Sequence, residues 1–303
     1  MTVVPRAFVI GHPIAHSRSP LIHGFWLEEQ AVAGSYERID VAPDELADFV
    51  RGMAAAGFKG GNVTVPHKRA VLDLVDEADA AARNIGAANT LWVEDGRLLA
   101  TNTDADGFVR SLDAEAPAWD KAGHGRAVVI GAGGAARAVV YGLLGRGFVV
   151  DVLNRSVDRA ETLADAFGPR VRPYGLPDAA ERLGSADLLV NTTTLGMAGS
   201  PPLDLDLTSL GRGALVCDIV YVPIETELLR QARALGHRTV GGLGMLLHQA
   251  VPGFAKWFGV RPRVSAELRR LVEQDLRATS PNTLTPNPSP QGRGASRGHG
   301  RVS

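Results

Sequence analysis

The chain has 303 residues, of which 45% are hydrophobic, which is enough apolar material for one large or two ordinary domains. Its 32 basic and 33 acidic residues give a formal net charge of -1, which provides no basic surface for nucleic acid or anionic lipid. The single cysteine, Cys217, excludes an intramolecular disulfide and a cysteine-cluster zinc site. No signal-peptide core and no membrane-spanning apolar run is found. We expect a cytoplasmic monomer or homodimer that binds a small molecule and no metal.

The first hundred residues alternate between short strand patterns and helical patterns. Ser19 is expected to cap the first helix, with Pro20 at its first position. Asp95-Gly96 marks a two-residue hairpin between two short strands. The other predicted elements are strands at 6–10, 35–39 and 61–65 and helices at 20–30, 44–56 and 67–83.

A second series of strands and helices begins at Arg126. Its alternation is typical of a doubly wound parallel sheet of the Rossmann type. The predicted strands lie at 127–130, 148–153, 171–173, 187–191, 214–219 and 238–240, with helices between most of them. After Gly241 the pattern is helical to Thr279.

These two series predict an α/β protein of two domains. Residues 1–105 form the first domain, and the C-terminal helices at 241–279 return to complete it. Residues 106–240 form the Rossmann-type domain. Residues 280–303 contain many Pro, Gly and Ser and almost no large apolar side chain, so we expect a disordered, dispensable tail.

A run of small residues follows the first strand of the second series. Gly131 permits a tight turn, Gly133 lets the backbone approach a pyrophosphate at the helix N-terminus, and Ala136 keeps helix and strand close. A turn that only packs a helix against a sheet is the alternative. The strand-turn-helix context favours a dinucleotide. The run consists of Gly131, Ala132, Gly133, Gly134, Ala135 and Ala136.

The end of the second strand carries Asn154 and Arg155 where NAD-binding sites usually place an acidic residue. Arg159 follows four residues later, so the two arginines share one helix face if Ser156 caps that helix, and can clamp a 2′-phosphate. Two solvated surface arginines are the alternative. The position favours NADP as the cofactor of the second domain. Thr192, in the polar loop after the fourth strand, is expected to line the nicotinamide ribose, although an ordinary polar loop looks similar.

Three polar residues of the first domain form a candidate catalytic group. Lys68 lies in the first turn of the helix predicted at 67–83, where the helix dipole disfavours an ammonium, which argues against a purely structural lysine. Symmetric pairing about the hairpin turn places Asn89 opposite Asn102, with Asp104 two residues beyond. Asn89 and Asp104 can then hold adjacent hydroxyls of a polyol and orient Lys68 for proton transfer. A surface lysine and a capping aspartate are the alternatives.

Two hydroxyl side chains, Ser17 and Ser19, precede the first helix. A substrate carboxylate can accept hydrogen bonds from both and gains from the helix dipole. Plain helix capping explains Ser19 but not Ser17.

In their order and spacing these segments resemble shikimate dehydrogenase, over about the first 275 residues. The resemblance is carried by GHPIAHSRSP at 11–20, NVTVPHK at 62–68, GAANT at 86–90, NTD at 102–104, GAGGAA at 131–136, NRSVDR at 154–159, DIVYVP at 218–223 and GLGMLLHQA at 242–250.

The resemblance implies reversible hydride transfer between NADPH and 3-dehydroshikimate, which gives shikimate on the route to chorismate and the aromatic amino acids. It makes Lys68 and Asp104 the catalytic pair, with Lys68 handling the proton of the C3 oxygen. Further roles follow by position: Ser17, Ser19 and Tyr221 for the carboxylate, Thr64, Asn89 and Gln249 for the ring hydroxyls, Gly242 and Met245 beside the nicotinamide, and Ile219 as a cofactor residue.

Three positions depart from the family pattern. His12 stands where Asn is frequent, His67 where Phe is frequent, and Ala105-Asp106-Gly107 follows Asp104 where Gly often comes first. Asp106, two residues after Asp104, can alter the local field around Lys68, so the rate and the pH optimum stay open, but none of these residues replaces a proposed catalytic group.

Two other functions are compatible with parts of this sequence. A quinate/shikimate dehydrogenase relative would share the fold and the Lys68–Asp104 pair but accept quinate or use NAD; Arg155, Arg159 and the serine pair argue against it. A non-catalytic dinucleotide-sensing module would need only the Rossmann half. The polar residues outside that half, including Asn89 and Gln249, argue against a sensor.

Overall fold

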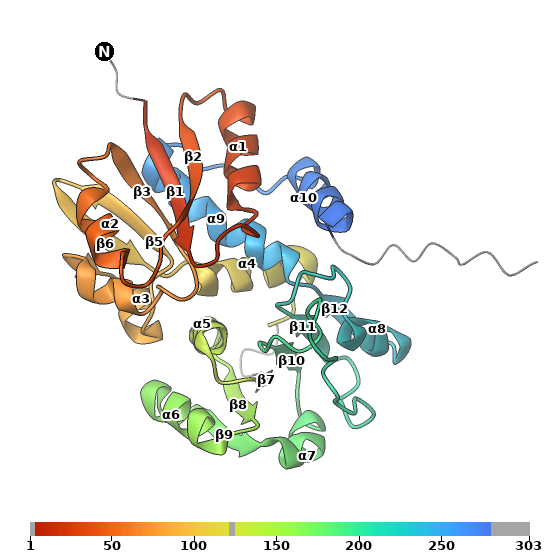
Figure 1. Cartoon of the computed structure of the whole chain (residues 1–303). Helices are drawn as coiled ribbons and strands as arrows, with labels where there is room; N and C mark the ends of the chain where they lie inside the picture. Colours follow the sequence, from red (N-terminus) through yellow and green to blue (C-terminus); the bar gives the residue numbers. More distant parts are fainter. Residues whose placement is uncertain (1–3, 121–124, 280–303) are drawn as a thin grey trace, which may run out of the picture.

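The computed structural model describes residues 4–120 and 125–279. It consists of two α/β domains, one above the other in Figure 1, each built around its own sheet. The tail predicted at 280–303 lies outside the described residues.

The first domain contains a six-stranded mixed sheet with the order β2-β1-β3-β5-β6-β4. Strand β1 pairs in parallel with β2 and β3, whereas β5 runs antiparallel to both β3 and β6. The hairpin has the predicted symmetric register, in which Thr90 lies opposite Thr101. The strands are β1 (Arg6–Gly11), β2 (Ser35–Asp40), β3 (Phe58–Val63), β4 (Glu77–Ala78), β5 (Thr90–Glu94) and β6 (Arg97–Thr101).

Helices cover both faces of this sheet. One face packs against α1, α9 and α10, where Trp26 and Phe254 are fully buried, so α9 and α10 form part of the core on this face. The other face packs against α2, α3 and the 3-10 helix η1. These elements are α1 (Ser19–Glu29), α2 (Leu46–Gly52), η1 (Ala70–Leu74), α3 (Ala80–Ile85), α9 (Leu243–Phe258) and α10 (Ala266–Thr279).

The second domain contains a fully parallel sheet with the order β12-β11-β10-β7-β8-β9. Counted from its own first strand this is 3-2-1-4-5-6, the order of dinucleotide-binding domains, and the order reverses between β7 and β10. The strands are β7 (Arg126–Ile130), β8 (Val149–Asn154), β9 (Val171–Gly175), β10 (Leu188–Asn191), β11 (Leu215–Asp218) and β12 (Arg238–Val240).

Residues of α4, α5 and α6 pack on one face of the parallel sheet, and α7 and α8 pack on the other. Helix α4 also packs against α9, so it contacts both domains, and the boundary expected at 105/106 falls in its first turn. These elements are α4 (Asp104–Glu115), α5 (Gly134–Gly145), α6 (Val157–Phe167), η2 (Leu176–Asp178), α7 (Ala179–Leu183) and α8 (Glu227–Ala234).

The helix predicted at 67–83 is wrong. The chain forms η1, then the short strand β4, and only then α3. Backbone pairing with the hairpin is the reason, because Asp76 N donates to Leu98 O at 2.8 Å and Leu98 N donates to the Asp76 carboxylate at 2.6 Å. Asp79 then begins α3 as its N-cap, where its side chain accepts from Ala82 N. Lys68 therefore lies in a turn, and the helix-dipole argument for it does not apply.

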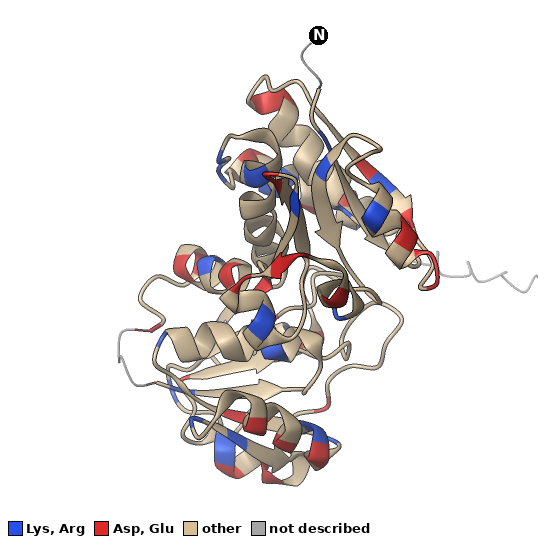
Figure 2. Cartoon of the chain, turned by 90° about the vertical axis from the view of Figure 1, so that its left-hand side faces the viewer, with Lys and Arg blue, Asp and Glu red and all other residues tan. Residues whose placement is uncertain are grey.

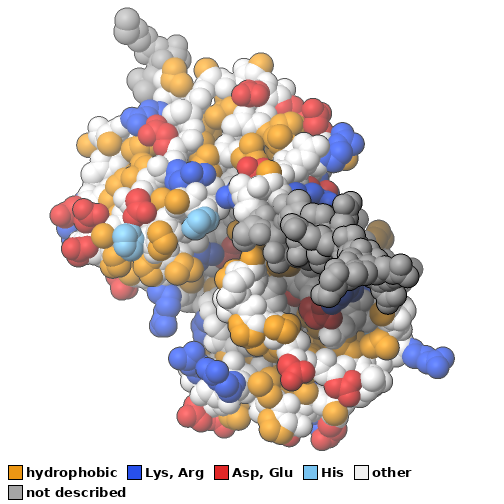
Figure 3. All heavy atoms as spheres, turned by 45° about the vertical axis from the view of Figure 1, so that its right-hand side comes forward, with side chains coloured by type: hydrophobic (Ala, Val, Ile, Leu, Met, Phe, Trp, Pro, Cys, Tyr) orange, Lys and Arg blue, Asp and Glu red, His pale blue; other side chains and the backbone are white. Residues whose placement is uncertain are grey.

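Acidic and basic residues are interspersed along both domains in the ribbon of Figure 2, and charged side chains of both signs are scattered over the face shown in Figure 3. Within the described residues, no helix has the length and apolar character needed to cross a membrane.

Candidate active site

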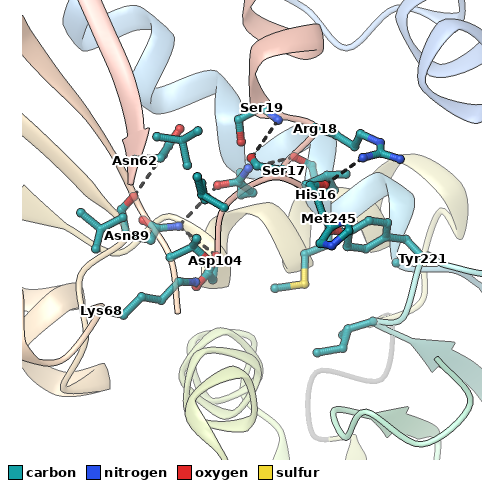
Figure 4. Close-up of a pocket in the computed structure, with 18 of the residues that line it drawn as sticks. His16, Ser17, Arg18, Ser19, Asn62, Lys68, Asn89, Asp104, Tyr221 and Met245 are labelled. Atoms are coloured by element: carbon teal, nitrogen blue, oxygen red, sulfur yellow. Dashed lines mark hydrogen bonds and ion pairs between the residues drawn. The ribbon is translucent and has the colours of Figure 1, made fainter. Parts of the chain in front are cut away.

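A cavity of about 360 Å³ lies where β1 and β3 end, between these strands and helix α9 (Figure 4). It brings together all eight residues predicted for catalysis and substrate binding, and three of the predicted cofactor residues. The polar residues that line it are His16, Ser17, Arg18, Ser19, Asn62, Thr64, Lys68, Asn89, Asp104, Tyr221 and Gln249, and Ile219, Gly242 and Met245 complete the side toward the second domain.

Lys68, Asp104 and Asn89 form one hydrogen-bonded group. Lys68 Nζ donates to Asp104 Oδ2 at 2.6 Å, and Asn89 Nδ2 donates to Asp104 Oδ1 at 2.9 Å. The side chains of Lys68 and Asp104 are 28% and 14% exposed, so a ligand in the cavity can reach the pair while most of the surrounding water is excluded. An ammonium held in this way can donate a proton to a ligand oxygen and then recover it.

The orientation of Asn89 is fixed by its neighbours. Its Oδ1 accepts hydrogen bonds from Thr103 N at 2.8 Å and from Thr90 Oγ1 at 2.9 Å. The amide nitrogen is therefore turned toward Asp104. Gln249, from α9, reaches the same group, since its Oε1 accepts a long hydrogen bond of 3.4 Å from Asn89.

Ser17, Ser19 and Tyr221 lie on the other side of the cavity, near the start of α1. The expectation that Ser19 caps this helix is wrong: α1 begins at Ser19 itself, and its N-cap Arg18 makes no side-chain capping bond. Ser17 Oγ instead accepts from Ser19 N at 3.3 Å. Burial raises the pKa of Tyr221, with the positive charge of Arg18 opposing that shift, so the phenol keeps its proton as a hydrogen-bond donor.

The predicted glycine-rich loop connects β7 to α5. Gly131 has φ +105°, and a Cβ there would lie 2.8 Å from Thr192 Oγ1, so the loop passes close to the strand-order reversal. A Cβ on Gly133 or Gly134 would meet no atom within 4 Å, which leaves open space before the first amide groups of a 12-residue helix. This arrangement fits a dinucleotide pyrophosphate. The Thr192 hydroxyl donates to Ile130 O at 2.7 Å, so in this structure it supports the loop.

Arg155 and Arg159 flank the start of α6, and both are exposed. Ser156 takes the N-cap position without a side-chain capping bond, and Asn154 Nδ2 donates to Ser156 O at 2.8 Å. Within residues 4–120 and 125–279, neither guanidinium forms an ion pair. Both remain available for a phosphate.

Gly242 allows the two domains to meet at the cavity. A Cβ at this position would lie 2.0 Å from Ile219 O, so only glycine permits the start of α9 to approach this carbonyl. Asp218, which precedes Ile219, accepts hydrogen bonds from Thr226 Oγ1 at 2.7 Å and from Val220 N at 3.0 Å. These bonds fix the loop that follows β11. Burial raises the pKa of Asp218, and these hydrogen bonds oppose the shift.

Comparison with known proteins identifies the family. Residues 9–91 match the model of the shikimate dehydrogenase substrate binding domain, and residues 116–197 match that of shikimate / quinate 5-dehydrogenase. A curated shikimate dehydrogenase (NADP(+)) from Azorhizobium caulinodans is 57% identical over 274 residues, which are 90% of this chain and 97% of that protein. The chain belongs to the shikimate dehydrogenase family.

Solved structures of the family share the two-domain fold. Shikimate 5-dehydrogenase from Thermus thermophilus, in complex with NADP(H) and shikimate, is 38% identical with a TM-score of 0.79, over 90% of this chain and 99% of that one. Quinate dehydrogenase from Corynebacterium glutamicum, in complex with NAD, is 33% identical with a TM-score of 0.81, over 89% of this chain and 99% of that one.

A buried layer beneath the cavity was missed by the sequence predictions. Tyr36 donates to Asn62 Oδ1 at 2.6 Å, and Asn62 Nδ2 donates to Asn89 O at 3.1 Å. His23 stacks on Tyr36 with 4.0 Å between ring centroids, and burial lowers its pKa to about 3, so the ring is neutral. Alternation of side chains offered one signal, because Asn62 in β3 is two residues before Thr64, which directly follows the strand. Tyr36 and His23 had no comparable signal.

The positions that depart from the family pattern have local partners. His67 is buried, with Nε2 2.7 Å from Val41 O, and His12 pairs with Asp40 at 2.6 Å. Asp106 binds Arg110 through both carboxylate oxygens, which partly neutralises it. In the described part of the chain, no cluster of three or more His, Cys, Asp or Glu could hold a metal ion.

Proposed function

We propose that this protein is an NADP-dependent shikimate dehydrogenase, which reversibly reduces 3-dehydroshikimate to shikimate. The observation that carries the proposal is the cavity itself, because it joins the Lys68–Asp104–Asn89 group to Ile219, Gly242 and Met245. A proton donor and a nicotinamide can therefore reach one substrate. The relatives named above, including the structure with NADP(H) and shikimate, support the same activity.

In the proposed reaction, NADPH held by the cofactor residues would supply the hydride for the substrate carbonyl carbon. The residues of this chain supply the proton and bind the substrate. Lys68 donates a proton to the carbonyl oxygen as the hydride arrives, and Asp104 holds the ammonium in place. Ser17, Ser19 and Tyr221 bind the carboxylate, while Thr64, Asn89 and Gln249 bind ring hydroxyls. These contacts fix the reacting carbon relative to the cofactor.

The cofactor residues fall into three groups, which bind the pyrophosphate, the 2′-phosphate and the nicotinamide side. The loop from Gly131 to Ala135 receives the pyrophosphate at the N-terminus of α5. Asn154, Arg155 and Arg159 surround the adenosine 2′-phosphate, and Thr192 and Ile219 support the nicotinamide side. In this proposal residues 106–240 form the NADP domain and residues 1–105 with 241–279 form the substrate domain. A cytoplasmic location fits the single cysteine, which is buried.

The activity is tested by following absorbance of the reduced nicotinamide with purified protein. Four pairings are compared, shikimate or quinate with NADP or NAD. The proposal requires the highest kcat/KM with shikimate and NADP. Higher kcat/KM with quinate or NAD would favour the quinate dehydrogenase alternative, and no turnover in any pairing would favour the sensor.

Replacing Arg155 with Asp is expected to reduce kcat/KM with NADP by about ten- to a hundredfold, because a charge-assisted hydrogen bond to the phosphate is lost and a repulsive charge is gained. Turnover with NAD is retained. The ratio of kcat/KM for the two cofactors measures the effect. Arg212→Asp, at an exposed position in the same domain, is the matched control. An unchanged ratio in R155D would refute the phosphate clamp.

A further inference from the structure

One arginine of the cofactor domain is bonded to the substrate domain. Arg137 lies in the first turn of α5, one residue beyond the glycine-rich run. Its Nε donates to Ile85 O and its Nη2 donates to Asn84 O at 3.3 Å. Figure 1 shows α3 above α5, where the two helices pack together.

The carbonyls that Arg137 binds belong to the C-terminus of α3. Carbonyls of a last helical turn have no partner within the helix, and the helix dipole there favours a cation. Gly86 ends α3 with φ +73°, so the chain turns directly beneath the guanidinium. In its own helix, by contrast, Arg137 lies near the positive end of the dipole. Both of its side-chain hydrogen bonds are instead with the other domain.

The residues that follow α3 hold the catalytic group. Ala88 N donates to Lys68 O at 2.7 Å, and Asn102 Nδ2 donates to Ala87 O at 2.9 Å. Asn89 comes next, and its amide binds Asp104. A displacement of this segment would therefore move both Lys68 and Asn89.

The contact between α3 and α5 is tightly packed. Ile85 and Ala138 are fully buried, and Ala87 and Ala105 are nearly so, in one apolar cluster. These small side chains bring the backbones of α3, α4 and α5 close together. The Arg137 guanidinium also lies 5.2 Å from the centre of the Phe167 ring.

We propose that Arg137 is a positioning residue, which ties the dinucleotide-binding end of α5 to the C-terminus of α3, directly before segment 86–89, and so fixes Lys68 and Asn89 relative to the nicotinamide. The inference rests on the proposed function. Both ligand sites keep their own residues without Arg137, so its loss affects the alignment of the reactants more than the binding of either one.

The test compares Arg137→Met and Arg137→Lys with wild type. Arg137→Met is expected to lower kcat ten- to a hundredfold, while the Kd of NADPH and the Kd of shikimate each change less than threefold. The primary isotope effect on kcat, with NADPH deuterated at the transferred hydrogen, should rise as hydride transfer becomes limiting. Arg137→Lys keeps a cation for the carbonyls, and is expected to recover a third or more of the lost rate.

The matched control is Arg170→Met. Arg170 donates to Leu144 O at 3.2 Å, near the end of α5, so it caps a helix within one domain only. Its kcat should stay within twofold of wild type. An equal loss of kcat in R170M, or an unchanged kcat in R137M, would overturn the positioning role.

Three other outcomes have separate meanings. If the Kd of NADPH rises in R137M in proportion to the loss of kcat, Arg137 is a nucleotide ligand and the proposal is wrong. If wild type turns over no substrate pairing, the proposed function fails and this inference fails with it. If R137M does not fold, R137K is compared with wild type alone. A reduced kcat with a raised isotope effect would support the proposal, and a reduced kcat with a wild-type-like isotope effect would contradict it.

Discussion

Replacing Lys68 with Ala lowers kcat with shikimate and NADP by about 10³-fold, because the ammonium bonded to Asp104 is lost and a positioned general acid/base contributes about 10²- to 10⁴-fold. The Kd of NADP should change less than threefold, since Lys68 belongs to the substrate side of the cavity. Steady-state kinetics and a fluorescence titration of NADPH measure the two effects separately.

Lys59→Ala is the control for this substitution. Lys59 is exposed on β3, a few residues before the cavity, and its removal should leave kcat within twofold of wild type. If K68A retains more than a tenth of wild-type kcat while K59A behaves normally, Lys68 does not transfer the proton.

Asp104→Asn is expected to lower kcat/KM by about 10²-fold. The carboxylate accepts one hydrogen bond from Lys68 and another from Asn89, and each of its oxygens is used. An amide offers only one oxygen, so its NH₂ group must face either the ammonium or the amide nitrogen of Asn89. Donor then faces donor, and the arrangement of all three side chains is lost.

Asp106→Asn tests whether this effect is specific. Asp106 lies on the same helix but pairs with Arg110 outside the cavity lining, so its neutralisation should change kcat/KM less than threefold.

The double variant K68A/D104N should be little slower than K68A alone, because the two residues act as one unit. Fully multiplicative losses would show that they act independently.

The parts of the site that were predictable from spacing alone, without the family resemblance, lie close together along the chain. Symmetric pairing about Asp95-Gly96 predicted that Asn89 and Asp104 emerge together, and the hairpin register confirms its basis. The strands of the second domain were predictable because buried parallel strands are short apolar runs between glycine-rich turns and helices. The glycine-rich run at 131–136 predicted a dinucleotide site only because it lies between such a strand and a helix.

The remaining features depend on contacts between distant segments. Nothing near residue 76 indicates that the chain will join the sheet beside β6, so the helix predicted at 67–83 was wrong. The Tyr36–Asn62 hydrogen bond and the reach of Arg137 to α3 also join segments far apart in sequence. Patterns in short windows do not contain such pairings.

The packing of α9 and α10 on the first sheet has a consequence for synthesis. Trp26 is covered by aromatic residues of α9, so the N-terminal core stays incomplete until residues 243–279 leave the ribosome. The core of the parallel sheet is built almost entirely from its own strands and helices, with Met245 of α9 packed against it, and can form earlier. The substrate site, which needs Gln249, is thus finished last although most of its residues are made first.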